Sequence, residues 1–267
     1  MEYNMNEIVA ESDIVFITLD TLRYDVAQTL WIKGKLPNFS KWLSSDGWEQ
    51  RHTPGSFTYA AHHAFFAGFL PTPVAPEKHP RLFATRFAGS ETAVLNTCTF
   101  NAPTIVEGLQ QKGFKTICIG GVGFFNKQTP LSTVFPSLFE ESYWEEAFGV
   151  TNKHSTQAQF EKAADLLEKH LDPVFLFINI SALHQPNCFY LENNLQDTID
   201  SHAAALEYVD SQLPILMNAL NKRKQTFVIC SADHGTTYGE DGYTGHRIGH
   251  PNVWNVPYLE ILLTNES

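Results

Sequence analysis

The residue types that point to chemistry are two carboxylates and a histidine at the ends of apolar runs. Asp20 directly follows the run 14–19, and Asp233 and His234 come shortly after the run 226–230. In an open α/β sheet, ligand sites form outside the carboxyl ends of parallel strands, so we expect these side chains to converge. Mixed oxygen and imidazole ligands suit a divalent transition metal. The structural alternative is a helix cap at Asp20 and an ordinary turn at Asp233 and His234.

The hydroxyl group of Thr58 is the third group that could take part in a reaction. Thr58 precedes an alanine-rich apolar stretch that predicts a helix ending near Gly68. A hydroxyl at a helix N-terminus lies beside free backbone N–H groups at the positive end of the dipole, which suits an activated alkoxide and a bound phosphoryl group. Threonine is a weak nucleophile by itself, so this function requires the metal. The alternative is that Thr58 or Ser56 caps the helix.

The elements that must position these residues alternate between strands and helices. Short apolar runs predict buried strands at 14–19, 116–119, 174–180 and 226–230, with a last strand at 257–263. Helical patterns cover 37–43, 103–111, 155–171 and 203–220, with a kink expected at Pro214. Continuous apolar strands separated by helices imply a largely parallel sheet covered on both faces. The sequence therefore predicts an α/β protein, a three-layer α/β/α sandwich forming one domain over 1–267, with 71–80 as an irregular excursion.

Composition narrows the class of protein. Hydrophobic residues make up 43% of the 267 residues and charged residues 18%, which is typical of a folded globular chain. With 18 Lys and Arg against 29 Asp and Glu, the net charge of -11 argues against a nucleic-acid partner. No apolar run approaches the roughly 18 residues that span a bilayer, and the first residues lack an apolar leader. We expect a cytoplasmic protein without a membrane partner; its oligomeric state is not readable from these features.

The cysteines give no sign of a structural framework. They are widely scattered, and two of them lie inside apolar, strand-like runs; the four are Cys98, Cys118, Cys188 and Cys230. Neither a disulfide framework nor a Cys-x-x-Cys metal site is indicated, and reduced, mostly buried thiols are expected.

Several segments resemble one family. DIVFITLDTLRYD resembles the opening strand of the sulfatase-like and phosphodiesterase branch of the alkaline phosphatase superfamily, TYAAHHAFFAGFLP its nucleophile helix, and SADHG its second metal motif. HAAALEYVDSQLPILMNAL is similar to the long helix before that motif, and GHRIGHPNVWNVPY to the segment after it. The match runs in register from about residue 13 to 263. A small uncharacterised bacterial group of sulfatase-like hydrolases looks closer still, without an established substrate.

The resemblance implies roles for individual residues. The metal set would be Asp20, Thr58, Asp233 and His234, with Thr58 also the nucleophile. His184 matches a histidine that contacts substrate or leaving group, and His246 matches a substrate contact or second-metal ligand, so these two form a candidate second site. His62 is nearest to a substrate-binding position of the nucleophile helix. Lys127 is a candidate for binding an anionic substrate tail, with simple solvation as the alternative.

Departures from the family pattern narrow the reaction. Thr58 stands where formylglycine sulfatases need cysteine or serine, so formylglycine chemistry is excluded. Thr21 replaces the usual second aspartate of calcium sulfatases, and Gly121 falls where their lysine would be. A site poorer in hard oxygen ligands favours zinc or manganese over calcium. The resemblance links a threonine nucleophile to cleavage of phosphate or phosphonate esters.

The sequence therefore predicts a metal-dependent hydrolase of a small anionic phosphate or phosphonate ester. The alternatives are a phosphoryl or phosphoethanolamine-type transferase or mutase, and a non-catalytic scaffold that keeps the fold. Sulfate-ester hydrolysis is a minor alternative.

Overall fold

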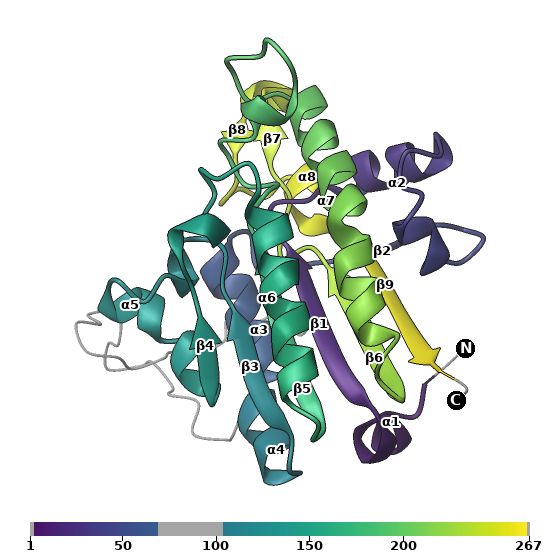
Figure 1. Ribbon diagram of the computed structural model, residues 1–267. Coiled ribbons are helices and arrows are strands. Elements are labelled where there is room, and N and C mark those ends of the chain that lie inside the picture. Colours follow the sequence, from purple (N-terminus) through teal and green to yellow (C-terminus); the bar gives the residue numbers. More distant parts are fainter. Residues whose placement is uncertain (1–2, 69–103, 266–267) are drawn as a thin grey trace, which may run out of the picture.

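A seven-stranded sheet forms the middle layer of the molecule (Figure 1). The computed structural model describes residues 3–68 and 104–265. In the order β2-β9-β6-β1-β5-β3-β4, the strands are β2 (Glu49–His52), β9 (Asn255–Thr264), β6 (Gln225–Ser231), β1 (Asp13–Leu19), β5 (Val174–Ile180), β3 (Lys115–Ile119) and β4 (Glu141–Tyr143). The five strands from β6 to β4 run parallel, and β9 and β2 add an antiparallel edge. The predicted α/β class with a largely parallel sheet is confirmed.

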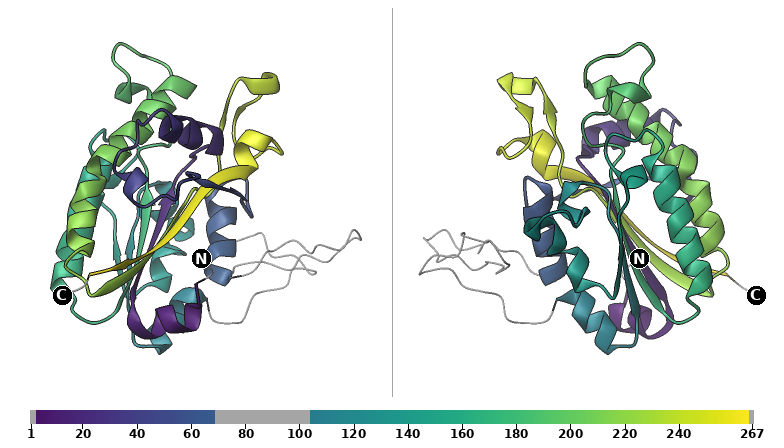
Figure 2. Two further views of the ribbon diagram at one scale, coloured as in Figure 1. Left: turned by 90° about the vertical axis from the view of Figure 1, so that its right-hand side faces the viewer. Right: turned by 60° about the vertical axis from the view of Figure 1, so that its left-hand side comes forward.

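Helices cover both faces of the sheet, as the two views of Figure 2 show. One face carries α2 (Tyr24–Ile32), α6 (Ser155–Lys169) and α7 (Ile199–Leu220), and the other carries α1 (Met5–Glu11), α3 (Thr58–Ala67) and α4 (Ile105–Gln111). The remaining short elements are α5 (Pro130–Thr133), α8 (Pro251–Trp254), the hairpin β7 (Thr237–Tyr238) and β8 (Thr244–Gly245), and the 3-10 turns η1 (Phe39–Lys41), η2 (Gly123–Phe125), η3 (Pro136–Leu138), η4 (Glu146–Phe148), η5 (Cys188–Tyr190) and η6 (Glu240–Gly242).

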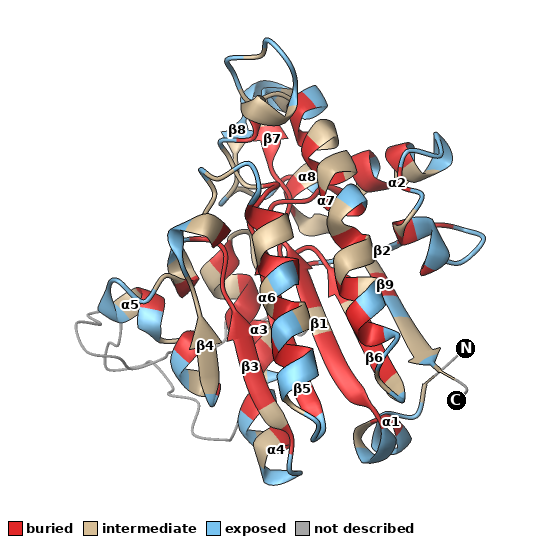
Figure 3. Cartoon of the chain, viewed as in Figure 1, coloured by how far each residue is buried: buried red, intermediate tan, exposed pale blue. Residues whose placement is uncertain are grey.

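The central strands are mostly apolar because helices cover both of their faces. Along β1, Val15 and Ile17 pack toward α6 and α7, whereas Ile14 packs toward α1 and α4. Strand β5 repeats this alternation, and all seven of its residues are buried (Figure 3). This double coverage explains why continuous apolar runs, rather than alternating ones, marked the strands in the sequence.

One sequence prediction needs correction on the α7 side of the sheet. The helix predicted over 37–43 is only the 3-10 turn η1, at whose start buried Asp210 of α7 accepts the backbone N–H groups of Asn38 (3.1 Å) and Phe39 (2.7 Å). Helix α7 also continues through Pro214 as one element. Proline has no N–H for the carbonyl of Asp210, four residues earlier, and the side-chain amide of Asn38 donates to that carbonyl instead (3.0 Å).

Some expected features cannot be placed. The excursion 71–80 and Cys98 lie outside the described residues. Within the described ranges, no helix combines the length and apolar character needed to cross a membrane.

Asp210→Ala is expected to lower the free energy of unfolding by about 2–4 kcal/mol, because it leaves buried donors of Asn38 and Phe39 without an acceptor. Urea unfolding followed by circular dichroism measures the loss. Asp210→Asn is the matched control: its amide oxygen still accepts the Phe39 N–H group, so it should lose clearly less. A loss within about 0.5 kcal/mol for the alanine variant would contradict the stabilising role assigned to the Asp210 carboxylate.

Candidate active site

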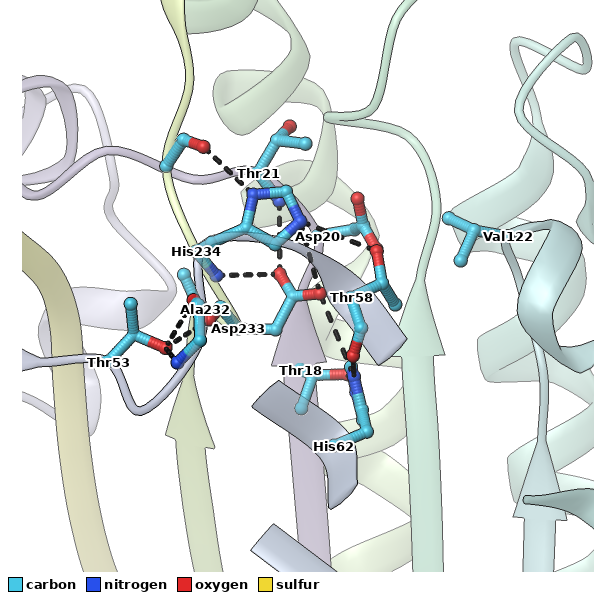
Figure 4. A network of polar contacts seen from close by, with 12 residues as sticks. Thr18, Asp20, Thr21, Thr53, Thr58, His62, Val122, Ala232, Asp233 and His234 are labelled. Carbon is cyan, nitrogen blue, oxygen red and sulfur yellow. Dashed lines mark hydrogen bonds and ion pairs between the residues drawn. The ribbon is translucent and has the colours of Figure 1, made fainter. Parts of the chain in front are cut away.

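The candidate metal ligands meet where β1 and β6 end side by side. The two strands are parallel neighbours, with Thr18 paired to Ser231, so the residues that follow them emerge at the same edge. One ligand atom each from Asp20, Asp233 and His234 lies within 4.8 Å of the others, and all three residues are fully buried (Figure 4). The structure thus brings together the three residues that the sequence places at strand ends.

Thr58 joins this group from the opposite side of the site. It is the first residue of α3, and its hydroxyl donates to Asp20 Oδ2 at 3.3 Å and lies 3.3 Å from His234 Nε2. The N-cap residue of α3 is Phe57, which provides no side-chain cap. The capping alternative for Thr58 is therefore wrong, and a helix start without a side-chain cap is a suitable place for an anion.

Two carboxylate oxygens at this site are buried without a hydrogen-bond partner, Asp20 Oδ1 and Asp233 Oδ2. Burial raises the pKa of Asp20 to about 7, with the charge of Asp233 as the second cause. Burial likewise raises the pKa of Asp233 to about 7, against hydrogen bonds from the backbone N–H groups of Thr21 and His234. Buried, uncompensated acceptors beside an imidazole fit a bound divalent cation.

The imidazole of His234 is oriented as a metal ligand. Its Nδ1 lies 2.8 Å from the carbonyl oxygen of Gly235, and because a carbonyl can only accept, Nδ1 carries the hydrogen. The lone pair of Nε2 then faces Thr58 and the carboxylates, and burial lowers the pKa of His234 and keeps the ring neutral. Gly235 is required here, since a Cβ atom would lie 1.9 Å from the carbonyl oxygen of Asn252.

Thr21 and Gly121 explain two departures from the calcium sulfatases. Thr21 has a left-handed φ of 63°, and its hydroxyl donates to the carbonyl of Leu183 at 3.0 Å, so the side chain is committed to the backbone. At Gly121, a Cβ atom would lie 2.2 Å from the carbonyl oxygen of Asn179. Neither position can supply a side chain to the site in this packing.

A cavity of about 490 Å³ opens at Thr58. Its polar lining from three separate segments comprises Thr58, His184, His246 and Arg247, and the connection between β3 and β4 adds Val122, Gly123, Phe124, Thr129, Leu131 and Ser132. The cavity therefore joins the nucleophile position to imidazoles, one guanidinium and an apolar surface.

His184 and His246 lie beside the candidate metal ligands. The His246 ring is 4.5 Å from the His234 ring and 6.4 Å from the His184 ring, measured between centroids. His184 Nδ1 bonds to the carbonyl of Gln185, which leaves its Nε2 free. Burial, together with the charges of His234 and His184, lowers the pKa of His246 to about 3. In the described part of the chain, neither histidine joins the group that could hold a metal.

The structure corrects the expectation that His62 binds substrate. His62 is fully buried among aromatic rings that include Phe125 and Phe177. Its Nδ1 donates to the carbonyl of Thr58 at 2.7 Å, and its Nε2 accepts from the hydroxyl of Thr18 at 3.1 Å. Burial lowers its pKa to about 3, so the ring is neutral. His62 supports the nucleophile from below and does not reach the cavity.

Lys127 is also placed differently from the expectation. Its ammonium group donates to the carbonyl of Ser142 at 2.8 Å on the exposed side of β4, and Lys127 does not line the cavity. The cation that does line it, Arg247, was missed in the sequence. The only available signal was its position next to His246 in GHRIGH, because its approach to Thr58 depends on a hairpin that returns from nearly 190 residues away.

Asp20→Asn is expected to stabilise the metal-free protein at about pH 8. A carboxyl group with a raised folded-state pKa stabilises the fold fully below its unfolded value of 3.8, and this contribution is lost as the pH rises through about 7. Asparagine cannot ionise, so a gain of at least about 1 kcal/mol at pH 8 should vanish near pH 4.

Urea unfolding of EDTA-treated protein measures this gain, with the exposed Asp46→Asn as control, which should show none. Adding zinc should make wild type the more stable of the two proteins at pH 8, since wild type gains the free energy of zinc binding and Asp20→Asn does not. An Asp20→Asn variant less stable than wild type in EDTA at pH 8 would contradict the burial argument.

Comparison with known proteins identifies the family. The Sulfatase family model matches residues 12–261. The chain is similar to the C-terminal periplasmic domain of phosphoethanolamine transferase EptC from Campylobacter jejuni (TM-score 0.63, 14% identity, 94% of this chain and 79% of that one). It is also similar to the C-terminal periplasmic domain of EptC from Escherichia coli in complex with zinc (TM-score 0.63, 13% identity, 96% of this chain and 73% of that one).

A third solved structure, an alkaline phosphatase superfamily protein from Vibrio parahaemolyticus, matches with a TM-score of 0.59 and 16% identity over 94% of this chain and 60% of that one. A search of curated proteins finds no significant match. At these identities the structures show a shared fold. Two of them are periplasmic domains, so the predicted cytoplasmic location gains no support. Since the family model covers nearly the whole chain, the protein belongs to the sulfatase family.

Proposed function

We propose that this protein is a metal-dependent enzyme that cleaves phosphate or phosphonate esters with Thr58 as its nucleophile. The observation that carries the proposal is the position of the Thr58 hydroxyl, 3.3 Å from both Asp20 Oδ2 and His234 Nε2, at the uncapped start of α3. A threonine placed only for stability would not need two buried carboxyl groups and a lone-pair-bearing imidazole around its hydroxyl.

Zinc or manganese is the proposed cofactor. The donor set is two carboxylates, one imidazole nitrogen and one hydroxyl, whereas calcium takes about six to eight oxygen ligands. The zinc complex of the E. coli EptC domain is consistent with this choice. When bound, such an ion lowers the pKa of a coordinated hydroxyl and offsets negative charge on phosphoryl oxygens.

Individual residues of this chain then have separate roles in the proposed reaction. The Thr58 hydroxyl loses its proton to solvent, its oxygen attacks phosphorus, a P–O bond forms, and the bond to the leaving group breaks. Water then attacks the phosphorus held on Thr58, and the bond between phosphorus and the Thr58 oxygen breaks. First-turn N–H groups of α3 donate to the phosphoryl oxygens. Nδ1 of His184 bonds to the carbonyl of Gln185 and so carries a hydrogen; the imidazolium form, which also carries one on Nε2, gives that Nε2 proton to the leaving oxygen. His246 is less suited to this role in the free protein, because its pKa of about 3 keeps it neutral.

Membership in the sulfatase family does not make sulfate esters the proposed substrate. A formylglycine can arise from cysteine or serine, and position 58 is a threonine. The non-catalytic alternative is disfavoured by Asp20 Oδ1 and Asp233 Oδ2, because buried acceptors without partners cost stability and a bound cation is what would compensate them.

Group transfer is the second candidate, favoured by the fold shared with two phosphoethanolamine transferase domains. In this reaction the group held on Thr58 passes to an alcohol instead of water. The positions of Thr58, Asp20 and His234 serve both reactions equally, so the acceptor has to be determined by experiment.

Thr58→Ala is expected to lower the turnover of aryl phosphate mono- and diesters by at least about 10³-fold, because the variant lacks the hydroxyl that is proposed to attack phosphorus. The assay uses metal-stripped protein re-supplied with zinc, manganese or calcium. Thr58→Ser, which keeps a hydroxyl, is the control and should retain measurable activity. Elemental analysis should find nearly unchanged metal in the alanine variant. Turnover at the wild-type rate in that variant would refute the nucleophile assignment.

Product ratios are expected to distinguish hydrolysis from transfer. If water is the acceptor, the aryl alcohol and inorganic phosphate appear in equal amounts from a monoester, whether or not glycerol or ethanolamine is added. If an alcohol is the acceptor, the added alcohol should increase release of the aryl alcohol while phosphate lags behind. We expect equal release for a hydrolase; a persistent excess of aryl alcohol would favour the transferase.

A further inference from the structure

The arginines of the described ranges differ in whether a carboxylate forms an ion pair with them. Three of the four form ion pairs: Arg23 with Asp25, and two others elsewhere, Arg51 with Glu49 and Arg223 with Asp13, at N–O distances of 2.6 to 2.8 Å. Among the described residues, no carboxylate lies within ion-pair distance of the guanidinium of the fourth, Arg247. This charge is therefore available to a ligand.

Arg247 is held next to the nucleophile at two points. Its backbone N–H donates to the carbonyl of Ser56 at 2.9 Å, and its guanidinium lies over the ring of Phe57, 5.8 Å from the centroid. Phe57 directly precedes Thr58, and Arg247 and Thr58 line the same cavity. The two contacts thus couple the position of this side chain to the start of α3.

An anionic ester that reaches Thr58 in this cavity comes close to the buried carboxyl group of Asp20, which accepts from the Thr58 hydroxyl, so a positive charge in the cavity favours its binding. Two other candidate positions within the described ranges do not supply it. Gly121 has no room for a side chain, and Lys127 is bound to the carbonyl of Ser142. A guanidinium carries five N–H donors in a planar fork that matches two oxygens of a phosphoryl group.

We propose that Arg247 is a substrate-binding residue whose guanidinium donates two hydrogen bonds to non-bridging oxygens of the substrate's phosphoryl group. The inference rests on the proposed function, since it takes an anionic phosphoester as the ligand of the cavity. It assigns the recognition of that anion to a residue outside the metal ligands and the histidines. The ester's organic group then lies toward the apolar lining, which includes Val122, Phe124 and Leu131.

The test uses inorganic phosphate as the probe and does not depend on turnover. Binding to zinc-loaded Thr58→Ala is measured by calorimetry and compared with zinc-loaded Thr58→Ala/Arg247→Ala. Loss of a charge-assisted bidentate contact predicts about 10- to 100-fold weaker binding. Arg247→Lys should fall between the two, because it keeps the charge and loses the fork.

Arg51→Ala in the same background is the matched control. Arg51 is also stacked on an aromatic ring, that of Tyr258 at 4.7 Å, but it is paired with Glu49 and lies outside the cavity. Its loss should leave phosphate affinity unchanged. Equal phosphate affinity with and without Arg247, or no binding to either protein, would overturn the inference. Failure of the proposed function is a separate result, namely that zinc-loaded wild type cleaves no ester.

Discussion

Two carboxyl groups buried side by side, Asp20 and Asp233, set the main constraint on this structure. Each is fully buried, each keeps one oxygen without a hydrogen-bond partner, and burial raises both pKa values toward neutrality. Such a pair destabilises the metal-free fold at neutral pH, because ionising either group places a charge in a poorly solvated site. A divalent cation removes that cost, so the same two residues couple metal binding to stability.

A chain of hydrogen bonds between uncharged groups fixes the position of Thr58. Asn179 of β5 donates to the Thr18 hydroxyl of β1, Thr18 donates to His62, and His62 donates to the carbonyl of Thr58. This chain connects two central strands to the first turn of the nucleophile helix. Since every member is buried and its role as donor or acceptor is defined, the Thr58 hydroxyl is held against Asp20 before any substrate arrives.

Local packing also decides which reaction of the family this chain could carry out. The backbone at Gly121 approaches Asn179 too closely for a side chain, and the hydroxyl of Thr21 is bonded to the carbonyl of Leu183. Among the described residues, Arg247, from the segment after β8, is the arginine or lysine that lines this cavity. A shared fold therefore leaves the reaction open, and these side chains carry the argument for phosphoester chemistry.

The sequence by itself determined the strands and the residues that end them. Strands covered on both faces are mostly apolar, so β1, β5 and β6 were visible as apolar runs, and polar residues such as Asp20 and Asp233 stood out just after them. The family match extended this to nearly the whole chain.

Only the tertiary structure decided which way His62 faces, that Lys127 bonds to Ser142, and that Arg247 reaches the cavity. It likewise decided that the expected helix over 37–43 is one 3-10 turn and that a carboxylate from α7 accepts the N–H groups of residues 38 and 39. The physical reason is range: apolar periodicity reports burial over a few neighbouring residues, whereas hydrogen-bond partners and charge compensation depend on contacts between residues more than 100 positions apart.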